Sequence, residues 1–129
     1  MKKITFFLLM SLLLIGCTKD EPVVAPMNYR LVDFIFTTSV PSQTNTFRVE
    51  IYYEYNGQNY TIVNGAYINL RNAVYQLYRE VPYGSTIRYR FSDFTENITV
   101  EAYVERVPVI PPTSVNSTMV EWIGSFIVR

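Results

Sequence analysis

The run from Phe47 to Tyr55 constrains the fold of this chain most, because its side chains alternate between two faces. Aromatic and aliphatic residues occupy every second position from Phe47 onward, whereas Arg48, Glu50 and Glu54 share the other face with Tyr52. A period of two is typical of a β-strand with one buried and one solvated face. Asn56-Gly57 follows directly, and this pair favours a two-residue type I′ hairpin, in which both residues need positive φ.

A hairpin of this type fixes the pairing of the two strands that it joins. Counting outward from the turn, we expect Tyr53 to face Tyr60 and Ile51 to face Ile62. Both pairs place apolar side chains opposite each other on the buried face. The alternation and the turn therefore predict the same hairpin.

The rest of the sequence consists of further short segments of strand character, separated by turn signals. Residues 74–81 fit a strand or a helix, but their β-branched and tyrosine content favours a strand. On the last segment, one face is expected to carry Val120, Trp122, Phe126 and Val128. The additional strands are expected at residues 29–37, 66–70, 74–81, 86–91, 97–107 and 119–128, with a proline-rich break at 109–112.

Seven or eight short strands without a strong helical pattern predict an all-β fold. The strand lengths and turn spacing indicate an antiparallel β-sandwich of the immunoglobulin-like or transthyretin-like type. A barrel built from the same strands is the alternative. Residues 28–129 are enough for one such domain with a modest core.

The first 17 residues have the order of parts found in a secretory signal. Lys2 and Lys3 precede an apolar run from Ile4 to Ile15, and Leu14-Ile15-Gly16-Cys17 closes it. The run is shorter than the about 20 residues that a membrane-spanning helix needs. No Ala-x-Ala-like cleavage site is present. The closing four residues resemble the lipobox of bacterial lipoproteins.

This resemblance implies that residues 1–16 are removed and that Cys17 becomes the first residue of the mature protein. Its thiol would carry a diacylglycerol and its amino group a further acyl chain, so that residues 17–27 tether the domain to the outer membrane. Thr18 does not resemble the aspartate that retains many lipoproteins in the inner membrane. Asp20 and Glu21 resemble the export signal of Bacteroidota-type surface lipoproteins, which favours the cell surface over the periplasmic face. A small β-sandwich after a lipobox is similar to many such proteins, but this likeness transfers no functional residues.

The composition limits the chemistry that we expect. The sequence has no histidine, the commonest general base and metal ligand. Acylation of the single cysteine would leave no thiol nucleophile. Removal of Lys2 and Lys3 leaves nine of the 11 basic side chains against 11 acidic ones, a net charge near −2 that does not attract nucleic acid. No cofactor is expected apart from the covalent lipid, and no enzymatic activity.

Carboxylates are the residues that a hydrolase would use here. Glu50 and Glu54 share one strand face, as do Glu101 and Glu105, but two strand residues four apart are separated by about 13 Å. That exceeds the roughly 5–9.5 Å between the acids of glycosidases. Cross-strand ion pairs are the expected role of these charges. Residues 92–97 group several oxygen ligands, but Asp, Ser and Asn are also ordinary turn formers, so no metal site is predicted.

Aromatic side chains are the strongest candidates for ligand binding. Tyr52 and Tyr103 are expected to point away from the core, Tyr83 to lie at a turn, and Trp122 to be either in the core or on the surface. Exposed aromatic rings stack on sugars, and tyrosine is enriched in protein interfaces. We therefore expect a non-enzymatic, lipid-anchored envelope module that binds a protein partner, with glycan binding through these tyrosines as the alternative.

Overall fold

The computed structural model describes residues 27–129, so the predicted signal and the lipobox-like motif ending at Cys17 lie outside the described residues. Within that range, no helix is long and apolar enough to cross a bilayer. The chain forms eight strands, which confirms the predicted all-β class. They are β1 (Tyr29–Thr37), β2 (Thr46–Tyr55), β3 (Gln58–Asn69), β4 (Val74–Pro82), β5 (Thr86–Ser92), β6 (Ile98–Val104), β7 (Val107–Val115) and β8 (Glu121–Ile127).

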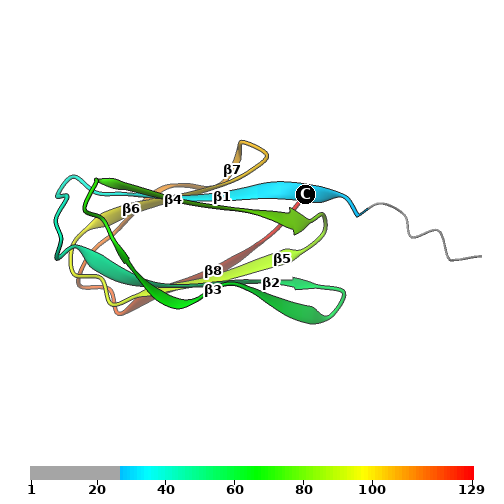
Figure 1. Cartoon of the computed structure of the whole chain (residues 1–129), viewed down its shortest axis with the longest axis horizontal. Coiled ribbons are helices and arrows are strands. Elements are labelled where there is room, and N and C mark those ends of the chain that lie inside the picture. The colour runs from blue at the N-terminus through cyan, green and yellow to red at the C-terminus, as the bar shows by residue number, and fades with distance from the viewer. Residues whose placement is uncertain (1–26) are drawn as a thin grey trace, which may run out of the picture.

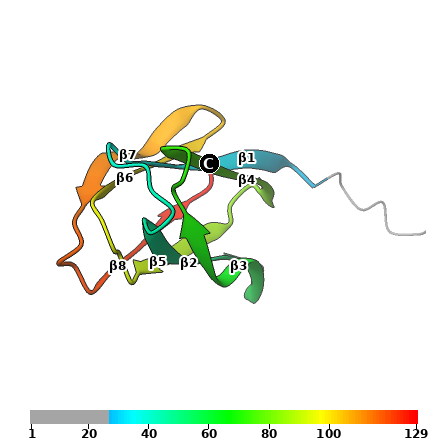
Figure 2. The same ribbon diagram turned by 60° about the vertical axis from the view of Figure 1, so that its left-hand side comes forward.

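The strands form two four-stranded antiparallel sheets that pack face to face (Figure 1). One sheet has the order β4-β1-β6-β7 and the other the order β3-β2-β5-β8. The turned view places β3 and β4 on one side of the molecule and β7 and β8 on the opposite side (Figure 2). Because the two layers are separate sheets, the fold is the predicted sandwich and not the alternative barrel.

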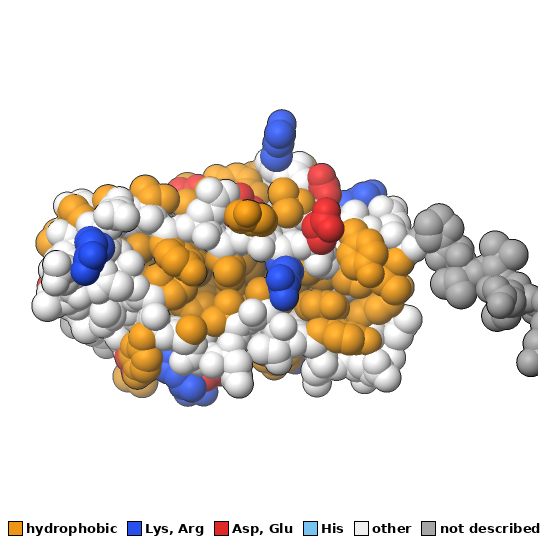
Figure 3. Space-filling model, viewed as in Figure 1, with side chains coloured by type: hydrophobic (Ala, Val, Ile, Leu, Met, Phe, Trp, Pro, Cys, Tyr) orange, Lys and Arg blue, Asp and Glu red, His pale blue; other side chains and the backbone are white. Residues whose placement is uncertain are grey.

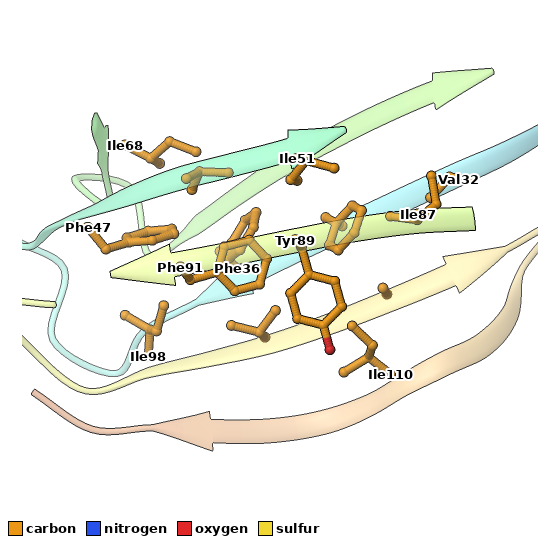
Figure 4. Close-up of a cluster of buried hydrophobic side chains, with 14 of the residues drawn as sticks. Val32, Phe36, Phe47, Ile51, Ile68, Ile87, Tyr89, Phe91, Ile98 and Ile110 are labelled. Carbon is orange, nitrogen blue, oxygen red and sulfur yellow. The ribbon is translucent and has the colours of Figure 1, made fainter. Parts of the chain in front are cut away.

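The core is an aromatic cluster between the layers. Phe34 and Phe36 of β1 meet Phe47 of β2 and Phe91 of β5, and none of the four is more than 2% exposed. The rings of Phe36 and Phe91 meet edge to face at 5.3 Å, and those of Phe36 and Phe47 lie 5.0 Å apart. Figure 4 shows Phe36, Phe47 and Phe91 between the strands, with Tyr89 beside Phe91. Aromatic pairs of this kind add about 0.5–1.5 kcal/mol beyond the burial of their surface.

The hairpin predicted at Asn56-Gly57 is present. Both turn residues have positive φ, at 51° and 74°, and Tyr53 pairs with Tyr60 through stacked rings 4.8 Å apart. Further along, Ile51 pairs with Val63, so the predicted partner Ile62 is wrong by one residue. A β-bulge causes the shift, because it inserts an extra residue on the β3 side. The same strand continues to Asn69, so residues 66–70 are not a separate strand.

The segment predicted as one strand over residues 97–107 is two strands. Glu105 and Arg106, with φ of 48° and 68°, form a tight turn between β6 and β7. The expected break at 109–112 is also wrong, since Pro111 and Pro112 lie within β7. Proline cannot donate a ladder hydrogen bond, but an edge strand has one side without a partner, and β7 is an edge strand.

The last strand mostly has the expected pattern. Trp122 and Phe126 are half-buried and Val128 is fully buried, so all three contribute to the core. Val120 is the exception at 84% exposed, because β8 begins only at Glu121.

Replacement of Gly57 by valine is expected to lower the free energy of unfolding by more than about 1 kcal/mol. Gly57 has a φ of 74°, a conformation that a β-branched side chain resists. Urea unfolding of both forms measures the change. Asn59→Val, at an exposed position of the adjoining strand, is the matched control and should change stability by no more than about 0.5 kcal/mol. Equal unfolding midpoints for the two variants would contradict the prediction.

Candidate functional site

The two sheets end in four edge strands, which differ in how well they are protected. Edge strands present unpaired backbone groups, and proteins cover them with prolines, bulges or charges. Strand β7 contains Pro108, Pro111 and Pro112, and β3 carries the bulge at Ile62. Strand β8 is regular, but it has only seven residues, and Trp122 and Phe126 pack into the core from it.

Strand β4 is the least protected edge. Its nine residues pair with β1 in unbroken register from Tyr29↔Pro82 to Thr37↔Val74. Its one proline is the last residue, and its charged residues, Arg79 and Glu80, lie near the same end, so residues 74–78 carry neither a proline nor a charge. Its outer side therefore offers a straight row of backbone donors and acceptors to a further strand.

The inner faces of β3 and β4 also remain partly uncovered. Side chains opposite each other in an antiparallel pair point to the same face, so Tyr75, Leu77 and Arg79 face inward with Phe36, Phe34 and Val32. Tyr60 and Val63 of β3 do so from the other sheet. Tyr60 and Tyr75 are nevertheless 39% and 38% exposed, because no strand lies beyond them. We call this surface the open edge, defined by Tyr60, Val63, Tyr75, Leu77 and Arg79.

Figure 3 views the molecule from this side and shows hydrophobic side chains running between the two layers. Tyrosines flank the open edge on the outer faces of the sheets, Tyr67 on β3 and Tyr78 on β4, which are 65% and 68% exposed. The Tyr67 hydroxyl donates a hydrogen bond to Asp93 at 2.7 Å. Exposed apolar groups gathered on one side of a small domain are typical of an interaction surface.

Arg79 is the cation of the open edge. Burial raises the pKa of Tyr53, the nearby Tyr60 and Tyr29 hydroxyls add to this rise, and the Arg79 guanidinium opposes it. Arg79 also lines a surface hollow together with Tyr29 and Tyr78. Within residues 27–129 it forms no ion pair, although Arg48, Arg88 and Arg90 all do. Glu80 lines the same hollow without forming an ion pair with Arg79, so the guanidinium can bind an acidic group of a ligand.

The four aromatic residues predicted as binding residues lie on different parts of the domain. Tyr52 is exposed on the outer face of β2, Tyr83 is exposed in the β4–β5 turn, and Tyr103 is half-buried on the outer face of the other sheet. Trp122 packs inside the sandwich, with its ring 5.5 Å from that of Tyr89. The structure thus does not bring these residues together into one platform.

Two of these tyrosines have partners that explain their positions. The Tyr103 hydroxyl donates a hydrogen bond to Glu101 at 2.5 Å, and this bond raises the pKa of Tyr103. The Arg30 guanidinium lies over the Tyr83 ring, 5.5 Å from its centre.

Tyr52 is the predicted aromatic residue that lines a hollow. A shallow groove of about 400 Å3 lies on the outer face of β2, β5 and β8. Tyr52, Arg88 and Ser125 form one row across these strands, and Ile123 stands in the next row. The groove therefore has one aromatic wall, one aliphatic wall and a polar floor.

The predicted cross-strand ion pairs are confirmed on this sheet. Between β2 and β5, Glu50 contacts Arg90 at 3.9 Å and Glu54 contacts Arg88 at 3.3 Å. Glu50 also contacts Arg48 of its own strand at 2.8 Å. Exposed pairs of this kind contribute little to stability individually.

The other two candidate glutamates, Glu101 and Glu105, form hydrogen bonds in the sheet β4-β1-β6-β7. Glu101 accepts the Tyr103 hydrogen bond, and Glu105 accepts one from the Leu31 backbone N–H at 2.8 Å. The four candidate carboxylates are thus divided between the two sheets.

The oxygen-rich stretch 92–97 forms hydrogen bonds that join its loop to β2 and to the neighbouring loops. Thr95 Oγ1 accepts a hydrogen bond from the Thr46 backbone N–H at 2.8 Å and donates one to the Thr44 carbonyl at 2.9 Å. Asn97 Oδ1 accepts a bond from the Ser117 N–H. No group of three or more acidic, histidine or cysteine side chains gathers within residues 27–129.

The open edge was not predicted from the sequence, although one signal for it was present. The segment Val74–Val81 lacks the alternation of the other strands, since apolar residues occur at both odd and even positions. In the structure the side chains from Val74 to Glu80 are exposed or half-buried on both faces of β4, which agrees with this mixed pattern. Comparison of the chain with family models, with curated proteins and with solved structures finds no match.

Proposed function

We propose that this protein is a non-enzymatic, lipid-anchored module of the cell envelope, and that it binds a protein partner at the outer membrane through its open edge. The unprotected β4 edge beside exposed apolar side chains is the observation that carries the proposal. The lipobox-like motif ending at Cys17 supports the anchor.

The geometry favours an extended partner segment that adds to β4. Backbone hydrogen bonds to β4 would hold the segment, and every second side chain would point inward. Apolar side chains at those positions would cover Tyr75 and Leu77. A carboxylate at the level of Arg79 would complete a charge-assisted pair.

Site-specific crosslinking tests the binding surface in the full-length protein. A photoreactive residue at Tyr75 is expected to capture one envelope protein in source cells, through a segment with alternating apolar residues and an acid. The same residue at Ile123, exposed on the opposite side of the molecule, is the control. Preferential capture from Ile123, or capture through a segment without an acid, would contradict the proposed surface.

Replacement of Arg79 by glutamate is expected to weaken binding of the captured partner by about 2 kcal/mol or more, because it removes one ion pair and adds repulsion. Isothermal titration with the purified partner measures the loss. Arg71→Glu, which makes the same charge change in the β3–β4 loop, should leave affinity nearly unchanged. If both substitutions weakened binding equally, the net charge of the domain, and not the position of Arg79, would determine the affinity.

The anchor has a separate test. Replacement of Cys17 by alanine is expected to block acylation and to move the protein from the detergent phase to the aqueous phase on phase separation. Unchanged partitioning would overturn the lipoprotein proposal while leaving the partner surface intact.

Glycan binding at the Tyr52 groove is the second candidate function. The groove combines an aromatic ring with Arg88, whose charge is already paired with Glu54, and such a surface suits a neutral sugar. Titration with purified surface polysaccharide of the source cells should show binding that Tyr52→Ala abolishes. Tyr67→Ala, on the open-edge side, should leave it unchanged.

A further inference from the structure

Tyrosines gather at the end of the sandwich where the described chain begins. Met27, Tyr29 and Pro82 line a small hollow together with tyrosines of the β2–β3 hairpin. The start of β1, the hairpin and the C-terminus lie at this same end (Figure 1), and Figure 3 shows the hydrophobic group beside the start of the described chain. Five of the 11 tyrosines belong to this end, namely Tyr29, Tyr53, Tyr55, Tyr60 and Tyr83.

Several of these side chains are exposed, although they lie next to one another. Met27, Tyr29 and Tyr83 are each 47–48% exposed. The Tyr83 backbone N–H donates a hydrogen bond to the Asn28 carbonyl at 2.6 Å, which attaches the β4–β5 turn to the start of the chain. The aromatic surface is thus continuous and fixed to the domain.

Basic side chains accompany the tyrosines. Arg30 lies over the Tyr83 ring and donates a hydrogen bond to Asn28 Oδ1 at 2.7 Å, and Arg129 ends the chain nearby. The four loops at the opposite end, residues 38–45, 70–73, 93–97 and 116–120, contain no tyrosine, and their charged residues are Arg71, Asp93 and Glu96. The two ends of the sandwich therefore differ in aromatic content. The turn between β6 and β7 adds one charge of each sign to the tyrosine end, Glu105 and Arg106, and Glu105 accepts a hydrogen bond from the Leu31 backbone N–H.

We propose that this tyrosine end docks on the lipid headgroups of the membrane that holds the anchor, an inference that rests on the proposed acylation of Cys17. Tyrosine prefers the boundary between water and lipid, because its ring is apolar and its hydroxyl is polar. An arginine near an anionic lipid surface is attracted to it electrostatically. The tyrosine rings of this surface suit the apolar side of the boundary, and its arginines suit the anionic headgroups.

The length of the tether agrees with this orientation. Cys17 and Met27 are ten residues apart and can be separated by at most about 35 Å. To turn the opposite end toward the membrane, the tether would have to extend along the whole domain, about 30 Å for β1 alone. Docking through the tyrosine end needs no such extension, and it leaves the β4 edge facing sideways and open to a partner.

Spin-label accessibility in the full-length, acylated protein tests the orientation. The protein is reconstituted in vesicles of phosphatidylethanolamine and phosphatidylglycerol, with a single label at Gln58→Cys near the tyrosine end or at Ser39→Cys at the opposite end. An aqueous nickel chelate is expected to reach the label at position 58 several-fold less than the label at position 39. Replacement of both Tyr29 and Tyr83 by serine should make the two labels equally accessible.

The matched control is the double variant Tyr67→Ser, Tyr78→Ser, which removes two tyrosines that are more exposed but lie away from this end. It should leave the label at position 58 protected. Vesicle-bound protein with equal accessibility at both positions would overturn the docking but not the anchor. Failure to float with the vesicles would overturn both proposals. The control double variant could instead lose protection at position 58 as much as the Tyr29, Tyr83 double variant does. That result would show that loss of any two tyrosines releases the domain, and it would contradict the proposed surface.

Discussion

Replacement of Phe91 by alanine is expected to lower the free energy of unfolding by about 3–5 kcal/mol, a large part of the about 5–15 kcal/mol that stabilises a domain of this size. Phe91 is fully buried, and its ring contacts both layers. It stacks on Tyr89 of its own strand at 5.1 Å and meets Phe34 of the opposite sheet edge to face at 6.1 Å. Alanine would remove these contacts and leave a cavity that the two sheets cannot close.

Urea unfolding measures this loss, and an unchanged slope with denaturant would show that the unfolding remains two-state. Phe91→Leu, which retains most of the volume, should cost clearly less than alanine. Tyr67→Ala, at an exposed position on β3, should change stability by no more than about 0.5 kcal/mol. A loss below about 1.5 kcal/mol for Phe91→Ala would mean that the aromatic cluster does not dominate the core.

The sequence pattern predicted the β2–β3 hairpin correctly, because neighbouring residues determine a hairpin. Phe47–Tyr55 and Asn56-Gly57 contain both the alternation and the turn, so the hairpin and its first pairs could be read from consecutive residues. The bulge at Ile62 could not be predicted, because the residues next to the turn alternate regularly and do not indicate that an extra residue follows in β3. The pairing beyond it is therefore shifted from the prediction.

The identity of the edge strands depends on pairing between distant segments. Strand β4 pairs with β1, more than 35 residues earlier, and β7 is at an edge only because no further strand joins it. Hence the prolines of β7 predicted a break instead of an edge strand. The mixed pattern of Val74–Val81 was ambiguous for the same reason, since it records exposure on both faces.

For the candidate binding residues too, exposure could be predicted from the local sequence, whereas their arrangement on the surface could not. The sequence correctly indicated that Tyr52 and Tyr83 are exposed, because each follows from a strand face or a turn. It could not show which residues share a surface, since that depends on the order of strands in the two sheets. Arg79 became a candidate only when β4 was placed at an edge beside the hairpin tyrosines.

Replacement of Gly124 by alanine is expected to destabilise the domain by about 1–3 kcal/mol, as overpacking of a tight core does. A Cβ atom at Gly124 would lie 2.1 Å from the Tyr89 hydroxyl oxygen and 2.3 Å from the ring carbon that bears it. Tyr89 is only 7% exposed and is held between Phe91 and Trp122, so its ring cannot move aside freely. Glycine within a strand often marks such a close approach.

A double-mutant cycle isolates this contact from other effects of the substitution. Tyr89→Leu removes the hydroxyl and the outer ring atoms that the new Cβ would meet, so Gly124→Ala in that background should cost little or be stabilising. Ser125→Ala, the adjoining position with its side chain on the solvated face, should lie within about 0.5 kcal/mol of the wild type. An equal cost of Gly124→Ala with and without the Tyr89 ring would place the strain in the β8 backbone. A cost that disappears with the ring would establish that the absence of a side chain at Gly124 allows Tyr89 to close the core on the β8 side.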